Sequence, residues 1–192
     1  MKYIEPRIDH NAALRTFERR RLANLWGLLG RHYSTRSNAG SRDRRLPFAE
    51  LAWLPYYIIP IKVSSSRGES QITVSVEAYS GAFAIFQMHA DIVDGEVDGE
   101  TFPPRLTEEE AGRIGQKELL ATIMRQRSRG QKPVPGAVIS VDVLHYPFWV
   151  YYYERRLGFL DIKVLDAATG SKPGGKTRVA LIEAFSAASR GT

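Results

Sequence analysis

The strongest constraint on the fold is an order of predicted elements that occurs twice along the 192 residues. Each half predicts a helix, a basic polar segment, an apolar strand, an aromatic strand opened by proline, a turn and an alternating strand. The tetrapeptide LPYY at 54–57 matches YPFW at 146–149, and EAYSG at 77–81 matches DAATG at 166–170. The order of the elements, their spacing and the positions of the proline and glycine residues all agree. This agreement favours a duplication over a chance resemblance, so we predict two copies of one small unit.

The periodicity of apolar residues predicts the elements within each half. Steps of three and four residues predict a first helix over about 9–29 and a second over about 107–124. The second helix opens with a capping box formed by Thr107 and Glu110. Apolar and polar side chains alternate over 71–79, as in a strand with two different faces. We therefore predict an α+β protein in which each unit is a helix packed on an antiparallel sheet.

An acidic stretch separates the two halves. It contains two Asp-Gly pairs, which are typical of turns, and its acidic residues lack the ligand order of a calcium loop. We predict a first unit over 1–90, a second unit over 107–192 and a linker over about 91–106. We predict no metal site.

The segment Thr107–Gly170 resembles the PepSY domain, a cystatin-like unit of one helix and an antiparallel sheet. The resemblance depends on the capped helix, the strands over 138–144 and 148–153, and the pentapeptide DAATG, which matches the family's strand-ending Asp-Ala-x-Thr-Gly signature. The first half keeps the order with a weaker signature at 77–81. The resemblance implies two tandem cystatin-like units that bind or inhibit protein partners, and it brings no catalytic residue.

The aromatic strand over 148–153 predicts a surface that needs a cover. Its side chains are apolar or aromatic on both faces, whereas one helix covers only one face of a small sheet. The cover is either the other repeat or a second copy of the chain, and the sharper alternative is an exposed surface for a partner. The candidate partner-binding residues are Trp149, Tyr151, Tyr153 and, in the first half, Tyr57.

The net charge of +6 comes mostly from arginine-rich segments that follow the two helices. Cations at these places either favour the helix dipole or bind an anionic partner such as nucleic acid or an anionic lipid surface. Nearby aromatic strands could also stack bases. The candidate anion-binding residues are Arg36, Arg42, Arg44, Arg45, Arg127 and Arg129.

The octapeptide GSKPGGKT at 170–177 satisfies the phosphate-loop pattern G-x-x-x-x-G-K-[ST]. The strand before a phosphate loop is buried, parallel and apolar almost throughout, whereas residues 159–166 alternate. The upstream sequence also predicts hairpins instead of strand–helix crossovers. We interpret the octapeptide as a glycine-rich turn, and nucleotide binding is the third hypothesis.

The chain carries no cysteine, and its four histidines lack the spacing of ligand pairs, so we predict no catalytic residue and no cofactor. No apolar run approaches the roughly 20 residues of a membrane-spanning helix, and the first ten residues lack the apolar core of a signal peptide. These features favour a cytoplasmic protein, with peripheral membrane contact as an alternative.

The leading hypothesis is a non-enzymatic protein-interaction or regulatory module that binds a protein partner or itself. The alternative is a binder of nucleic acid or an anionic membrane surface.

Overall fold

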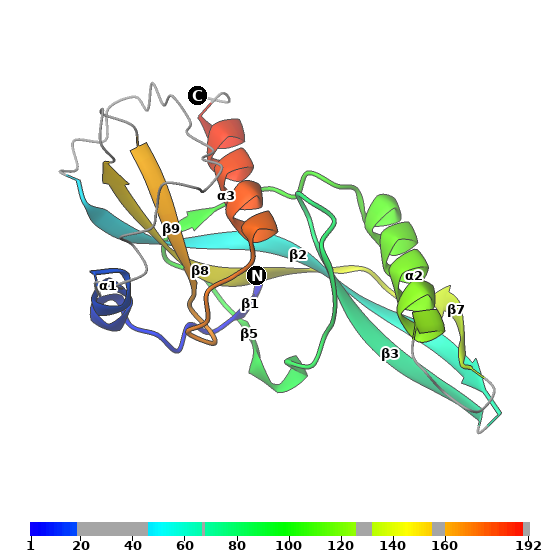
Figure 1. Ribbon diagram of the computed structural model, residues 1–192. Helices are drawn as coiled ribbons and strands as arrows, with labels where there is room; N and C mark the ends of the chain where they lie inside the picture. The colour runs from blue at the N-terminus through cyan, green and yellow to red at the C-terminus, as the bar shows by residue number, and fades with distance from the viewer. Residues whose placement is uncertain (19–45, 67, 126–131, 155–159, 190–192) are drawn as a thin grey trace. The chain divides into compact units, whose positions relative to one another are not determined.

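The computed structural model describes residues 1–18, 46–66, 68–125, 132–154 and 160–189 (Figure 1). The described residues form a mixed sheet and three α-helices, which confirms the predicted α+β class. None of these helices is long and apolar enough to cross a membrane. The α-helices are α1 (His10–Glu18), α2 (Glu108–Arg125) and α3 (Gly175–Ala188). The strands are β1 (Lys2–Ile4), β2 (Phe48–Ser65), β3 (Gly68–Glu77), β4 (Phe83–Ile85), β5 (Ile92–Asp94), β6 (Glu100–Thr101), β7 (Val134–Val138), β8 (Asp142–Glu154) and β9 (Leu160–Asp166).

The chain forms two compact units, each assembled from separate segments. Unit 1 contains Met1–Glu5, Leu54–Val97 and Thr101–Tyr146, and unit 2 contains Pro6–Trp53, Asp98–Glu100 and Pro147–Thr192. This composition differs from a division into 1–90 and 107–192, because the long strands β2 and β8 each begin in one unit and end in the other. As a result α2 shares unit 1 with β3, whereas α1 shares unit 2 with β9.

In unit 1, α2 covers one face of the sheet. Strand β3 pairs antiparallel with β2 in an unbroken register, from Tyr56 opposite Glu77 to Ser65 opposite Gly68. The helix approaches the sheet closely at Gly115, where a Cβ atom would lie 3.2 Å from Val74 Cγ2. A larger side chain at this position would therefore push the helix away from the sheet.

The capping box predicted for the second helix is confirmed. Glu110 accepts a hydrogen bond from the backbone N–H of Thr107 at 2.8 Å, and the Glu110 N–H donates to the Thr107 hydroxyl at 3.2 Å. The Thr107 hydroxyl also lies 3.0 Å from the Glu110 carboxylate, and the bonds from the Thr107 N–H and hydroxyl hold the pKa of this carboxyl below its ordinary value. The capping box also satisfies the backbone N–H groups of Thr107 and Glu110, which have no partner within the helix.

In unit 2, β9 pairs antiparallel with β8, from Phe148 opposite Asp166 to Glu154 opposite Leu160. Helix α3 is tied to β9 by Arg178, which donates to the Ile162 carbonyl at 3.2 Å and forms an ion pair with Asp161.

The acidic stretch predicted as a linker contains β5 and β6, and its Asp98 carbonyl accepts a hydrogen bond from Trp53 Nε1 at 2.7 Å.

The two matching pentapeptides form the same type of turn, one in each unit. Glu77 and Asp166 each accept hydrogen bonds from the backbone N–H groups two and three residues later, at 2.6 to 2.9 Å. Each turn then closes on a glycine in the left-handed region, with φ of 67° at Gly81 and 71° at Gly170. The shared geometry has a local cause, the carboxylate and the glycine. Duplication of the whole unit stays a prediction.

Substitution of alanine for Gly170 should destabilise the protein, because a side chain in the left-handed region costs about 1–2 kcal/mol. The new Cβ would also lie 3.2 Å from Ile8 Cδ1. Gly81→Ala should cost a similar amount, since its Cβ would lie 3.2 Å from Ile114 Cδ1. Gly175→Ala is the matched control, because Gly175 is not in the left-handed region and nothing lies within 4 Å of a Cβ there. Thermal unfolding followed by circular dichroism measures the difference, and equal melting temperatures for all three variants would contradict the explanation.

Candidate functional site

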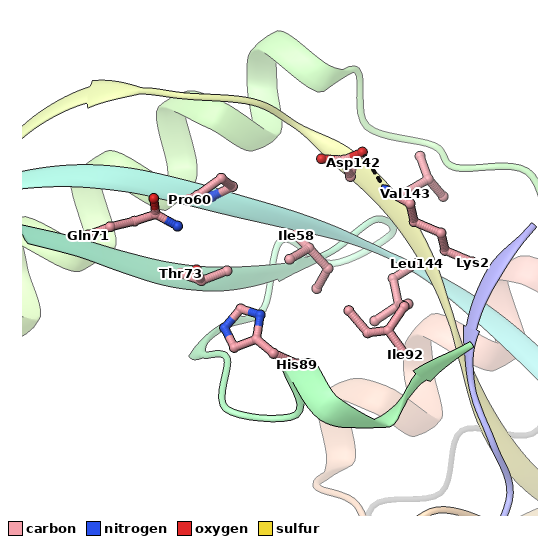
Figure 2. A pocket seen from close by; sticks show the side chains of 10 residues that line it. All are labelled: Lys2, Ile58, Pro60, Gln71, Thr73, His89, Ile92, Asp142, Val143 and Leu144. Atoms are coloured by element: carbon pink, nitrogen blue, oxygen red, sulfur yellow. Dashed lines mark hydrogen bonds and ion pairs between the residues drawn. The ribbon is translucent and has the colours of Figure 1, made fainter. Parts of the chain in front are cut away.

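A hollow of about 200 Å³ opens in unit 1 on the face of the sheet that α2 does not cover (Figure 2). Side chains alternate along β2 and β3, and the residues that pack toward α2 include Ile59 and Val74. The residues between them face the other way and form the hollow. Its floor is apolar and consists of Ile58, Pro60 and Leu144. We call this hollow the sheet pocket.

The wall of the sheet pocket is polar and comes from several segments. Gln71 and Thr73 lie on β3, and His89 lies in the turn of 3₁₀ helix between β4 and β5. The His89 ring packs edge-on against Phe86, with 4.9 Å between the ring centroids. Figure 2 shows His89 close to Thr73 and Ile58. The pocket thus combines an apolar floor with hydrogen-bonding groups at its sides.

An ion pair closes the far side of the sheet pocket. Lys2 Nζ lies 3.0 Å from Asp142 Oδ1, and both side chains are 46% exposed (Figure 2). The hydrogen bond to Asp142 and the charge of that carboxylate raise the pKa of Lys2 above its ordinary value. The same hydrogen bond lowers the pKa of Asp142, and the Ser140 hydroxyl, 3.1 Å from Asp142 Oδ2, adds to this effect. The two charges neutralise each other at neutral pH.

The outer edge of β3 is open beside the sheet pocket. Strand β4 pairs only with Val74–Val76, and the last bond runs from the Phe86 N–H to the Thr73 carbonyl at 2.9 Å. Within the described part of the chain, no strand pairs with β3 on this side before Thr73. Because residues of an antiparallel strand alternate in the side to which they hydrogen-bond, the backbone groups of Glu69 and Gln71 point outward. We call the segment Glu69–Thr73 the open edge.

The open edge and the sheet pocket share two residues. Gln71 and Thr73 contribute backbone groups to the edge and side chains to the pocket. A chain lying along the edge would therefore pass directly beside the pocket. No group of three or more His, Asp, Glu or Cys side chains that could hold a metal ion occurs among the described residues. The side chains that line the pocket offer apolar contact, hydrogen-bonding groups and one ion pair.

The predicted partner-binding aromatic residues lie in both units and make contacts inside them. Tyr57, in unit 1, is 3% exposed, and its hydroxyl donates to the Leu106 carbonyl at 2.6 Å. Burial raises the pKa of this hydroxyl above its ordinary value. In unit 2, Trp149 Nε1 donates to the Ile8 carbonyl at 2.7 Å.

The face of β8 that carries the other predicted aromatic residues meets α1. The ring of Tyr151 is 6% exposed and stacks on Phe17 with 5.1 Å between centroids, while the Tyr153 hydroxyl donates to Asp161 at 2.9 Å. Thus a helix from the first half of the chain covers this face. On the opposite face of β8, Tyr152 contacts Phe185 of α3. Partner binding by the aromatic face stays a prediction.

The six candidate anion-binding arginines lie outside the described residues, so anion binding also stays a prediction. They are Arg36, Arg42, Arg44, Arg45, Arg127 and Arg129.

The segment 170–177 connects β9 to α3. Gly170 closes the turn after the strand, Gly174 precedes the helix, and Lys176 and Thr177 lie in the first helical turn. Strand β9 is antiparallel to β8, as the hairpin pattern predicts, whereas the strand before a phosphate loop belongs to a parallel sheet.

Sequence reasoning predicted neither the open edge nor the sheet pocket. On the register of β3 with β4, the run at 82–88 would reach as far as Gln71, so its length does not indicate that β4 ends at Ile85. The pocket joins Lys2, His89 and Asp142, which lie far apart in the sequence.

Comparison with known proteins found no matching family model, no similar curated protein and no similar solved structure.

The ion pair predicts a shifted titration of Asp142. In a Lys2→Met variant the pKa of Asp142 should rise toward its ordinary value, because its principal hydrogen-bond partner is lost. The stabilisation from Asp142 is present above its unfolded-state pKa and is lost as the pH falls through the lowered, folded-state pKa. Carboxyl-carbon NMR over a pH series measures this titration. Glu110 is the internal control and should titrate identically in both proteins, and an unchanged Asp142 midpoint would refute the assignment.

Proposed function

We propose that this protein is a non-enzymatic protein-interaction module that binds an extended segment of a protein partner along the open edge of β3. The observation that supports the proposal is the stretch of β3, next to the point where β4 turns away, with which no other strand of the described residues pairs on its outer side. A peptide added there would continue the sheet, and its backbone would pair with outward-facing donors and acceptors. The PepSY resemblance agrees with this proposal, because it too implies a module that binds protein partners.

The available hydrogen bonds set the expected strength of binding. The outward groups are the N–H and C=O of Glu69, the N–H and C=O of Gln71, and the N–H of Thr73, since the Thr73 carbonyl already accepts from Phe86. At about 1 kcal/mol net for each bond, this edge would supply about 5 kcal/mol. Association also costs translational and rotational freedom, so these bonds alone would give a Kd weaker than roughly 0.2 mM. Tighter binding therefore requires side-chain contacts beside the edge.

A proline substitution at Gln71 tests the proposal. Gln71→Pro removes an outward N–H and places a ring against any added strand, but it leaves the bonds between β3 and β2 intact, so the fold should persist. We expect binding to a peptide selected from a displayed library of random short peptides to fall about tenfold or more. Gln71→Ala also removes the side chain that lines the sheet pocket but keeps the N–H, so it is the matched control and should bind more tightly than Gln71→Pro. Fluorescence anisotropy with the labelled peptide measures both affinities.

Three outcomes would contradict the proposal. The first is equal affinity of Gln71→Pro and the wild type for the selected peptide. The second is a dimer, seen by analytical ultracentrifugation, that Gln71→Pro dissociates, because a second copy would then occupy the edge. The third is a failure of the library to yield any binder, together with binding to RNA or anionic vesicles that weakens steeply as salt rises, which would favour the arginine-rich segments.

A further inference from the structure

We infer that the sheet pocket receives one apolar side chain of the bound segment, so that the partner is recognised by an aliphatic or aromatic anchor residue. This inference rests on the proposed function. Successive side chains of an added strand would point to opposite faces of the sheet. Every second residue would therefore lie on the same face as Gln71 and Thr73, which line the pocket.

The chemistry of the pocket selects an apolar group. Ile58 and Leu144 are buried and, with Pro60, present hydrocarbon at the floor. A charged or amide side chain that reached the floor would lose water without gaining a partner there, because the hydrogen-bonding groups of Gln71, Thr73 and His89 are at the sides. The charged groups Lys2 and Asp142 are at the far side and bind each other, so they offer no net charge to an ionic anchor.

The size of the pocket selects one side chain. Its volume is about 200 Å³. Pockets for whole small-molecule ligands are larger, about 300–1,000 Å³. Burial of one Val, Leu, Ile or Phe side chain strengthens binding by about tenfold or more. An anchor of this kind supplies the contact that the backbone bonds of the open edge lack.

His89 forms the side of the pocket close to Thr73. Its side chain is exposed and makes a T-shaped contact with the Phe86 ring, so truncation to alanine removes part of the wall without opening the core. Figure 2 shows the imidazole beside the gap between Thr73 and Ile92. The pocket of a His89→Ala variant should therefore accept a larger anchor than that of the wild type.

The experiment compares anchor preference between the wild type and His89→Ala. Each position of the selected peptide is replaced in turn by Ala, Leu, Phe and Asp, and the affinities are measured by anisotropy. In the wild type we expect one position at which Leu exceeds both Ala and Asp by about tenfold or more. In His89→Ala the preference at that position should shift from Leu toward Phe, with the other positions unchanged. Lys117→Ala, at an exposed position of α2 outside the open edge and the pocket, is the control and should keep the wild-type preference.

The outcomes separate this inference from the function on which it rests. If Gln71→Pro weakens binding but no position prefers an apolar residue, the open edge binds the peptide and the pocket inference is wrong. An anchor preference that His89→Ala leaves unchanged also overturns the inference, since the side chain then lies elsewhere. If Gln71→Pro has no effect on binding, the proposed function and the inference both fail.

Discussion

The unbroken antiparallel pairing of β2 with β3 is the interaction on which the candidate site depends. Its register extends from Tyr56 opposite Glu77 to Ser65 opposite Gly68 without a bulge. A shift by one residue would exchange the two faces of β3, so Val74 would leave the core under α2 and enter the sheet pocket. The same register turns the backbone groups of Gln71 outward. The core, the pocket and the open edge therefore share one cause.

Several carboxylates in both units form hydrogen bonds or ion pairs within the fold. Asp166 and Glu77 accept hydrogen bonds from backbone N–H groups of their own turns. Asp161 forms an ion pair with Arg178 and accepts a hydrogen bond from Tyr153. Such carboxylates resemble catalytic groups in a sequence, although in the structure they accept hydrogen bonds from neighbouring groups. The pentapeptide DAATG at 166–170 thus has a conformational explanation: the carboxylate closes a turn that ends on a left-handed glycine.

The aromatic strand shows where sequence reasoning reached its limit. Alternation correctly indicated that β8 would be apolar on both faces, and therefore that two covers were needed. The identity of the covers, α1 against Tyr151 and α3 against Tyr152, could not be predicted. Any amphipathic helix can cover an apolar face of a sheet. Local periodicity does not indicate which distant segment of the chain packs against that face.

The sequence by itself determined the local elements of this protein: the α+β class, the capping box of Thr107 and Glu110, the alternation of β3, and the glycine turns at Gly81 and Gly170. Each depends on residues within a few positions of one another, where propensity and hydrogen bonding act directly. Only the tertiary structure decided that α2 shares a unit with β3, that β4 leaves an edge open, and that Lys2, His89 and Asp142 surround one pocket. Those features arise from contacts between residues far apart in the chain, which depend on how whole faces pack and not on any local pattern.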